Sequence, residues 1–194
     1  MGYDPKAIIQ LGDLGMWKDV IKKFPHLDLP FYFILGNHED YHAELIMQGL
    51  PDCYIHLKPD EPTDICGLKA VGIGRSNYID TYNTPPGTTI RYEEVTKCIK
   101  KRPKIDMMIT HDCPSDIGMR SNFFGPWEDV GSEILEELFM DLKPKLWLFG
   151  HHHIDYTSYV DGCHFIGFKV ANDGFGILDT KYKSVRFASS ITEK

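Results

Sequence analysis

The sequence has no apolar run that approaches the ~20 residues needed to cross a bilayer, and no basic stretch precedes an apolar one at its amino terminus. We therefore expect neither a membrane span nor a secretory signal, and a cytoplasmic location. Paired cysteines are also lacking. The five cysteines are scattered and never spaced as C-x-x-C: Cys53, Cys66, Cys98, Cys113 and Cys163. This pattern argues against a zinc knuckle or a disulfide framework and favours reduced thiols.

Positive charge is scarce as well. The formal net charge is −7, with 21 Lys+Arg against 28 Asp+Glu. That balance does not indicate a nucleic-acid partner, although a local basic patch stays open. The remaining composition is ordinary for a soluble globular protein. A length of 194 residues predicts a single domain over residues 1–194 with a substantial core.

Four short apolar runs occur along the chain, and each stops at polar residues. They are apolar at nearly every position, as expected of strands buried on both faces. The runs cover 7–11, 31–35, 105–109 and 146–149. Helical spacing is found over 92–101 and 133–142, the latter with Ser132 as a plausible N-cap, and more weakly over 16–24. Strands alternating with helices predict an α/β domain with a largely parallel core sheet. Further short strands are predicted around 65–73 and at 156–160, 163–168, 174–179 and 185–188.

The polar residues that end the four runs are chemically related. Ligand sites of open α/β sheets form beyond the carboxyl ends of the strands, so these side chains should meet at one place. A single Gly-Asp pair or a lone histidine is more often structural, but four complementary groups in this order favour a metal site. The groups are Gly12-Asp13, Gly36-Asn37-His38-Glu39-Asp40, Thr110-His111-Asp112 and Gly150-His151-His152-His153.

These groups resemble the G-D, G-N-H-D/E, H and G-H-x-H motifs of the calcineurin-like metallophosphoesterases, and the likeness runs from about Ala7 to the carboxyl terminus. The resemblance implies a sandwich of two mixed β-sheets flanked by helices, with a two-metal site at one rim. It implies a metal-dependent hydrolase of phosphate mono- or diesters that uses a metal-activated hydroxide.

The resemblance also assigns roles to particular residues. Asp13 would bridge both metals. Asn37, His111 and His151 would complete the second metal, and His153 would belong to the first. Imidazole nitrogens combined with carboxylate and amide oxygens suit Mn, Fe or Zn better than Ca.

His38 would not bind metal but would protonate the leaving group or stabilise its charge. Glu39 or Asp40 would orient His38 from behind. For Asp112, a supporting role and a solvated position are equally open, and the ring of His152 is expected to point away from the metals.

One family motif has no counterpart. The family pattern begins with D-x-H on the first strand, whereas here no histidine precedes His26 and residues 7–11 already form the second strand. The first strand and helix of the usual domain are therefore expected to lie outside this sequence, which predicts a weak first metal site and an exposed sheet surface prone to self-association. Three explanations compete: a fragment or late start, a one-metal or ligand-sharing protein, or a catalytically silent metal-binding or interaction module.

The substrate is less constrained. Leu14-Gly15-Met16 follows Gly12-Asp13 in place of the V-D-R-G of serine/threonine phosphatases, which disfavours a protein substrate. The segment Thr110-His111-Asp112-Cys113-Pro114 resembles the S-H-D-W-P segment of RNA lariat debranching enzymes. Phosphodiesters, nucleotides and small phosphomonoesters all stay open.

Overall fold

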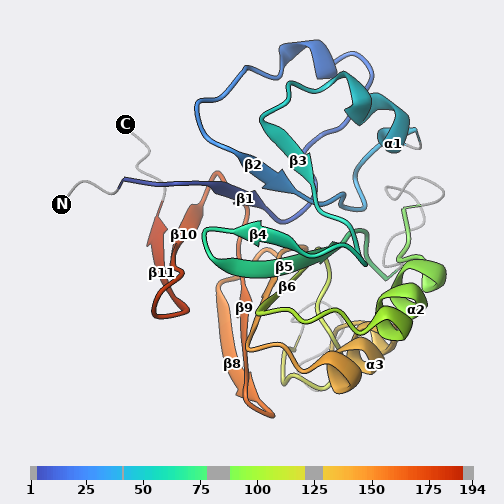
Figure 1. Cartoon of the computed structure of the whole chain (residues 1–194), viewed down its shortest axis with the longest axis vertical. Helices are drawn as coiled ribbons and strands as arrows, with labels where there is room; N and C mark the ends of the chain where they lie inside the picture. The colour runs from blue at the N-terminus through green and yellow to red at the C-terminus, as the bar shows by residue number, and fades with distance from the viewer. Residues whose placement is uncertain (1–3, 41, 78–87, 121–128, 190–194) are drawn as a thin grey trace.

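The computed structural model of the chain describes residues 4–40, 42–77, 88–120 and 129–189. Two β-sheets pack face to face, and helical segments cover the outer face of each (Figure 1). The predicted α/β sandwich is therefore confirmed, except that only one of its two sheets is mixed, because the strands described in the smaller sheet are all parallel. In the described part of the chain, no helix is long and apolar enough to span a bilayer.

The smaller sheet contains three parallel strands in the order β1 (Ile8–Gln10), β2 (Phe31–Phe33) and β3 (Tyr54–His56). Its outer face packs on a core of Met16, Phe33, Leu35 and Ala43. This core is covered by two 3₁₀ turns and one short helix: η1 (Ile21–Lys23), η2 (Met47–Gly49) and α1 (Ala43–Ile46).

The larger sheet has six strands in the order β4-β5-β6-β7-β9-β8. Its four inner strands are parallel, while the edge strands β4 and β8 are antiparallel to their neighbours, so this sheet is mixed. The bounds are β4 (Thr63–Ile65), β5 (Leu68–Ile73), β6 (Met107–Thr110), β7 (Leu146–Phe149), β8 (Tyr156–Val160) and β9 (Cys163–Gly167).

Strands β6 and β7 are buried on both faces, as their unbroken apolar sequences predict. Met107 and Leu148 belong to the core between the two sheets, whereas Met108 and Trp147 belong to the core under the helices. The Trp147 indole N–H donates to Thr110 Oγ1 at 2.8 Å, so its one polar atom is satisfied inside the core.

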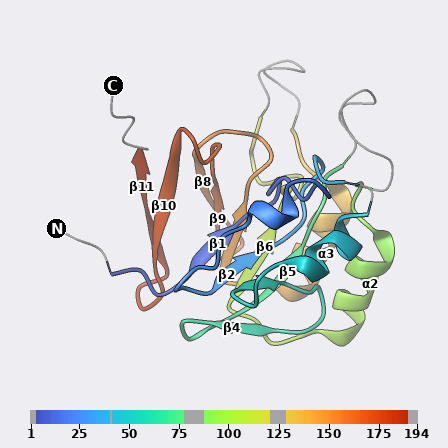
Figure 2. The same cartoon turned by 90° about the horizontal axis from the view of Figure 1, so that it is seen from above.

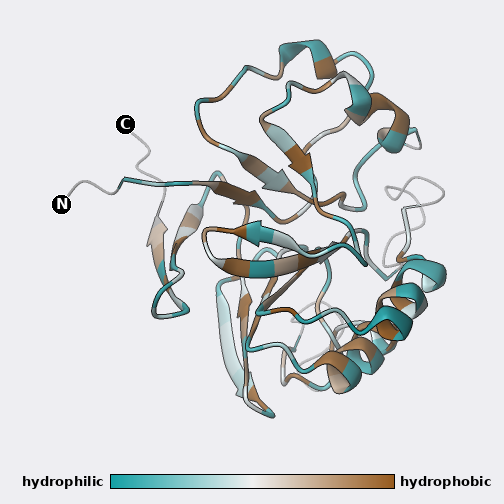
Figure 3. Cartoon of the chain, viewed as in Figure 1, coloured by the Kyte–Doolittle hydropathy of each residue, from teal (hydrophilic) through white to brown (hydrophobic). Residues whose placement is uncertain are grey.

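Helices α2 (Tyr92–Lys101) and α3 (Glu133–Leu142) cover the outer face of the larger sheet, with the bounds predicted from the sequence. Each has an apolar side that faces the sheet and a polar side that faces outward (Figure 3). Ser132 does occupy the N-cap position of α3, but its hydroxyl makes no capping hydrogen bond.

The predicted helix over 16–24 is wrong: only η1 forms there. The backbone of Met16 is engaged elsewhere, because its N–H donates to Glu39 Oε2 at 2.6 Å and its carbonyl accepts from Asp40 at 3.3 Å. The carbonyl of Met16, which a helix beginning there would use for an internal hydrogen bond, is thus occupied by a tertiary contact.

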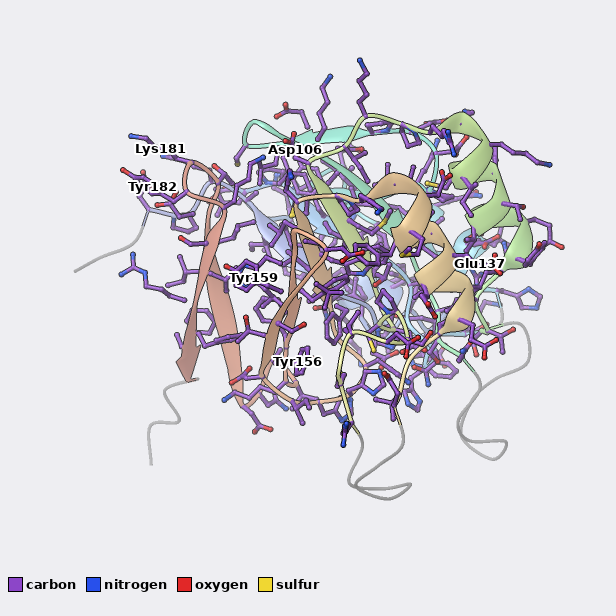
Figure 4. The ribbon with its side chains drawn as sticks, turned by 90° about the horizontal axis from the view of Figure 1, so that it is seen from below. Asp106, Glu137, Tyr156, Tyr159, Lys181 and Tyr182 are labelled. Carbon is purple, nitrogen blue, oxygen red and sulfur yellow. The ribbon has the colours of Figure 1, made fainter. Side chains whose placement is uncertain are left out.

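A hairpin of β10 (Gly174–Asp179) and β11 (Ser184–Ser189) lies at the side of the molecule opposite α2 and α3 (Figure 2). Lys181 and Tyr182 lie at its turn (Figure 4), and Lys183 reaches Asp106 before β6 at 2.8 Å. Leu178 and Val185 extend the core between the two sheets.

Candidate metal centre

Four of the five predicted ligands lie at the adjoining carboxyl ends of the two sheets. Asp13 and Asn37 follow β1 and β2 of the smaller sheet, while His111 and His151 follow β6 and β7 of the larger one. His111 Nε2 lies 2.9 Å from Asn37 Oδ1 and 3.4 Å from Asp13 Oδ2. The rings of His111 and His151 are 5.0 Å apart. Their convergence comes from the packing of two sheets and not from a single sheet edge.

The hydrogen bonds of His111 fix which ring nitrogen is free to bind a cation. Nδ1 lies 2.6 Å from the carbonyl oxygen of Leu11, which can only accept, so Nδ1 carries a proton. Nε2 then faces two oxygen atoms, those of Asn37 and Asp13. This arrangement requires either a proton on Nε2 or a cation between the three atoms. Imidazoles bound to metals usually donate their other N–H in this way, so these residues fit a divalent metal ion.

The charges of Asp13 and His111 are coupled. Burial opposes ionisation of Asp13, but hydrogen bonding and charge from His111 hold the pKa of this carboxylate well below its ordinary value. Burial also opposes the charged form of His111 and so lowers its pKa. The effect of the Asp13 carboxylate is larger and raises the pKa of His111 overall. His151 differs, because burial lowers its pKa to about 4 and keeps its ring neutral at physiological pH. The site thus contains an anionic oxygen ligand and a neutral imidazole.

Two glycines allow the ligands to approach one another. A Cβ at Gly12 would overlap the His111 ring, and one at Gly36 would overlap the carboxylate and backbone nitrogen of Asp13. Gly12 also has a φ of 100°, which side chains with a Cβ rarely adopt. Steric overlap therefore explains why glycine precedes both Asp13 and Asn37 at this site.

Gly36→Ala is expected to destabilise the protein by about 1–3 kcal/mol, because the added methyl group overpacks against Asp13. Its Mn²⁺ affinity should also fall, since Asp13 must move. Urea unfolding and calorimetric Mn²⁺ titration check this. Gly49→Ala is the matched control, because its Cβ would meet only Ile21 Cγ1 at 3.6 Å. Equal behaviour of the two variants would contradict the prediction.

Glu39 joins the two loops of the smaller sheet and does not orient His38 as predicted. Its side chain is buried and accepts from the N–H groups of Leu14 at 2.8 Å, Met16 at 2.6 Å and Gly36 at 3.4 Å. Burial raises its pKa despite these hydrogen bonds. The loop after β1 is thereby fastened to the loop after β2, which sets Asp13 beside Asn37.

His38 is exposed, and its backbone N–H donates to Asp13 Oδ1 at 2.9 Å. Asp40 accepts from the N–H of His42 at 2.8 Å and so supports the loop rather than the His38 ring. His153 is also exposed and lies two residues beyond His151, with a φ of 58°. The side chains of His38 and His153 are thus open to solvent, and within the described residues neither is held against the other candidate side chains by a contact of its ring.

Asp112 and His152 form a second contact between the loops of the larger sheet. Asp112 is 1% exposed, so the solvated alternative is wrong. Its carboxylate accepts from the N–H groups of Cys113 and Asn77, both at 2.8 Å, and lies 2.9 Å from His152 Nε2. Burial opposes ionisation, but the His152 hydrogen bond lowers the pKa of Asp112 overall. This pair connects the loop of His111 to that of His151, and no local pattern indicates it because the partners are 40 residues apart.

Comparison with known proteins agrees with this geometry. A sequence profile described as calcineurin-like phosphoesterase matches residues 2–155. The chain belongs to the calcineurin-like phosphoesterase family. Members of this family hydrolyse phosphate esters with bound divalent metals.

Two curated relatives of this calcineurin-like phosphoesterase are named lariat debranching enzymes. One, from Entamoeba histolytica, is 29% identical over 188 residues, covering 84% of this chain and 52% of the relative. Another, from Schizosaccharomyces pombe, is 28% identical over 185 residues, covering 80% of this chain and 39% of the relative. The chain thus spans about half or less of the length of these relatives.

Solved structures show the same fold at low sequence identity. A protein of Thermus thermophilus superimposes with a TM-score of 0.54 at 12% identity, covering 83% of this chain and 72% of that one. A structure described as a novel archaeal phosphodiesterase gives a TM-score of 0.51 at 17% identity, covering 95% of this chain and 82% of that one.

Proposed function

We propose that this chain is the catalytic part of a metal-dependent phosphodiesterase. The observation that carries the proposal is the position of His111 Nε2, which faces Asn37 Oδ1 at 2.9 Å and Asp13 Oδ2 at 3.4 Å. His151 supplies a second imidazole beside them. His153 is the proposed ligand for a further ion at the rim. A divalent ion held here would generate a nucleophile from water at neutral pH and offset negative charge on the phosphoryl oxygens.

The protein residues supply position and proton transfer. Leu11 fixes the His111 tautomer through the 2.6 Å contact with Nδ1, and Glu39 holds the loop of Asp13 against that of Asn37. His38 extends from this loop into solvent while its backbone N–H binds Asp13. We assign His38 the transfer of a proton to the leaving-group oxygen of the ester.

The substrate class rests on the relatives. Because two relatives carry the name of lariat debranching enzymes, a nucleic-acid phosphodiester, including a branched RNA, is the substrate to test beside small diesters. A net charge of −7 favours contacts confined to the region of the cleaved bond over many electrostatic contacts along the phosphate backbone of a nucleic acid.

The experiment is turnover of bis-p-nitrophenyl phosphate and p-nitrophenyl phosphate by the purified chain in Mn²⁺, with and without a chelator. Hydrolysis of the diester that is lost on chelation supports the proposal. A folded chain that binds Mn²⁺ but hydrolyses neither ester contradicts it and favours a catalytically silent module of the same fold.

A further inference from the structure

A pocket of about 380 Å³ lies between η1 and α1, outside the proposed metal centre. It is lined by Lys18, Ile21, Asp40, His42, Leu45 and Ile46. Leu45 is 65% exposed although it is strongly apolar. Ligand pockets are commonly lined by apolar side chains with a few polar groups among them, and this lining has that composition.

The pocket is built from the same two segments that carry Asp13 and His38. Beyond Asp13 the chain passes through Met16 to Lys18 and Ile21, and beyond His38 it passes through Asp40. Met16 and Asp40 are joined by a backbone hydrogen bond of 3.3 Å, and Glu39 fastens the same segments with its carboxylate. The position of the pocket relative to His38 is therefore fixed by the fold.

The walls of the pocket combine apolar and polar groups. Ile21 and Ile46 pack on the core that contains the fully buried Met16, so they form a firm apolar floor. Lys18 contributes a positive charge, and Asp40 and His42 add polar side chains to the lining. A flat apolar ring that carries polar edges and lies near a phosphate matches this set of contacts.

We propose that this pocket binds the nucleoside on the leaving-group side of a phosphodiester substrate. Ile21, Leu45 and Ile46 contact the base, and Lys18 faces a phosphate attached to the same nucleoside. The leaving-group side is assigned because Asp40, which lines the pocket, lies two residues beyond His38 in the loop after β2, and His38 is the residue proposed to protonate the leaving oxygen. The inference rests on the proposed phosphodiesterase function and names the part of the substrate that the site recognises.

The test is a calorimetric titration of the Mn²⁺-loaded chain with adenosine 5′-monophosphate and, separately, with inorganic phosphate. Leu45→Ala should weaken binding of the nucleotide roughly 5- to 20-fold more than binding of phosphate, because only the nucleotide has a base to contact. Leu45 is exposed, so its truncation leaves the core intact. Met140→Ala, which removes a 52% exposed side chain from α3, is the matched control and should change neither affinity.

Lys18→Ala should weaken nucleotide binding roughly 3- to 10-fold at low salt, and the loss should shrink at high salt as the charge is screened. Lys22→Ala removes another exposed charge from the same segment, outside the pocket, and should have no effect.

Turnover of bis-p-nitrophenyl phosphate is measured on the same samples. If the diester is turned over but Leu45→Ala weakens binding of the nucleotide and of phosphate equally, the nucleoside pocket is contradicted. The phosphodiesterase proposal is then still supported. If bis-p-nitrophenyl phosphate is not turned over but Leu45→Ala selectively weakens nucleotide binding, the nucleoside pocket is supported and the phosphodiesterase proposal is contradicted.

Discussion

His111→Ala is expected to lower kcat/KM for bis-p-nitrophenyl phosphate by roughly 10³-fold or more, since a catalytic metal contributes several kcal/mol to the transition state. His111 is 2% exposed and contacts Leu11, Asn37 and Asp13. Removing its ring would delete one proposed metal ligand and leave the Asp13 carboxylate without the His111 ring beside it. Steady-state kinetics and Mn²⁺ calorimetry on the same preparation measure both losses.

His164→Ala is the control for this variant. His164 lies on β9, where its ring contacts Thr157 and Tyr159 rather than the metal centre. Because a buried substitution can also unfold the chain, His151→Ala serves as a second, less buried ligand variant whose folding is checked by circular dichroism. Folded variants of His111 or His151 that retain normal Mn²⁺ affinity and rate would show that the ligand assignment is wrong.

His38→Ala is expected to act through the leaving group and not through metal binding. For a diester with an alkyl or nucleoside leaving group, kcat should fall by about 10²–10⁴-fold, the usual contribution of a general acid. For p-nitrophenolate, which departs without a proton, the fall should be far smaller. Mn²⁺ affinity should stay normal, because alanine keeps the backbone N–H that donates to Asp13 Oδ1 at 2.9 Å.

The matched control is His26→Ala, which removes another exposed histidine from outside the family motifs. The two leaving groups are compared in each variant under single-turnover conditions, so that product release does not mask the chemical step. An equal fall for both leaving groups in His38→Ala would mean that His38 binds the substrate rather than protonating it.

Much of the fold can be predicted from the sequence because its main signals are local. The unbroken apolar run of β7 requires burial on both faces, and Trp147 and Leu148 do belong to different cores. The bounds of α2 and α3 follow from helical spacing alone. The polar groups after the apolar runs identify the region of the site, since strands that run in parallel end on the same side.

The remainder depends on contacts between distant residues. Glu39 binds backbone groups 23 and 25 positions earlier, which no spacing pattern encodes. The carbonyl of Met16 accepts from the N–H of the distant Asp40, although the local sequence favours a helix that would use this carbonyl internally. The division of the four apolar runs between two sheets is likewise a matter of pairing: β1 and β2 pair in one sheet, and β6 and β7 in the other.

The division of the proposed ligands between two sheets would give a bound metal a mechanical role. Asp13 and Asn37 follow strands of one sheet, and His111 and His151 follow strands of the other. An ion bound by residues of both sheets would therefore oppose displacement of one sheet relative to the other. Its binding energy would resist that sliding by an amount that grows with ion concentration. Under mild denaturant, catalysis should accordingly disappear before the strands themselves come apart, because a small shear is enough to separate the two pairs of ligands.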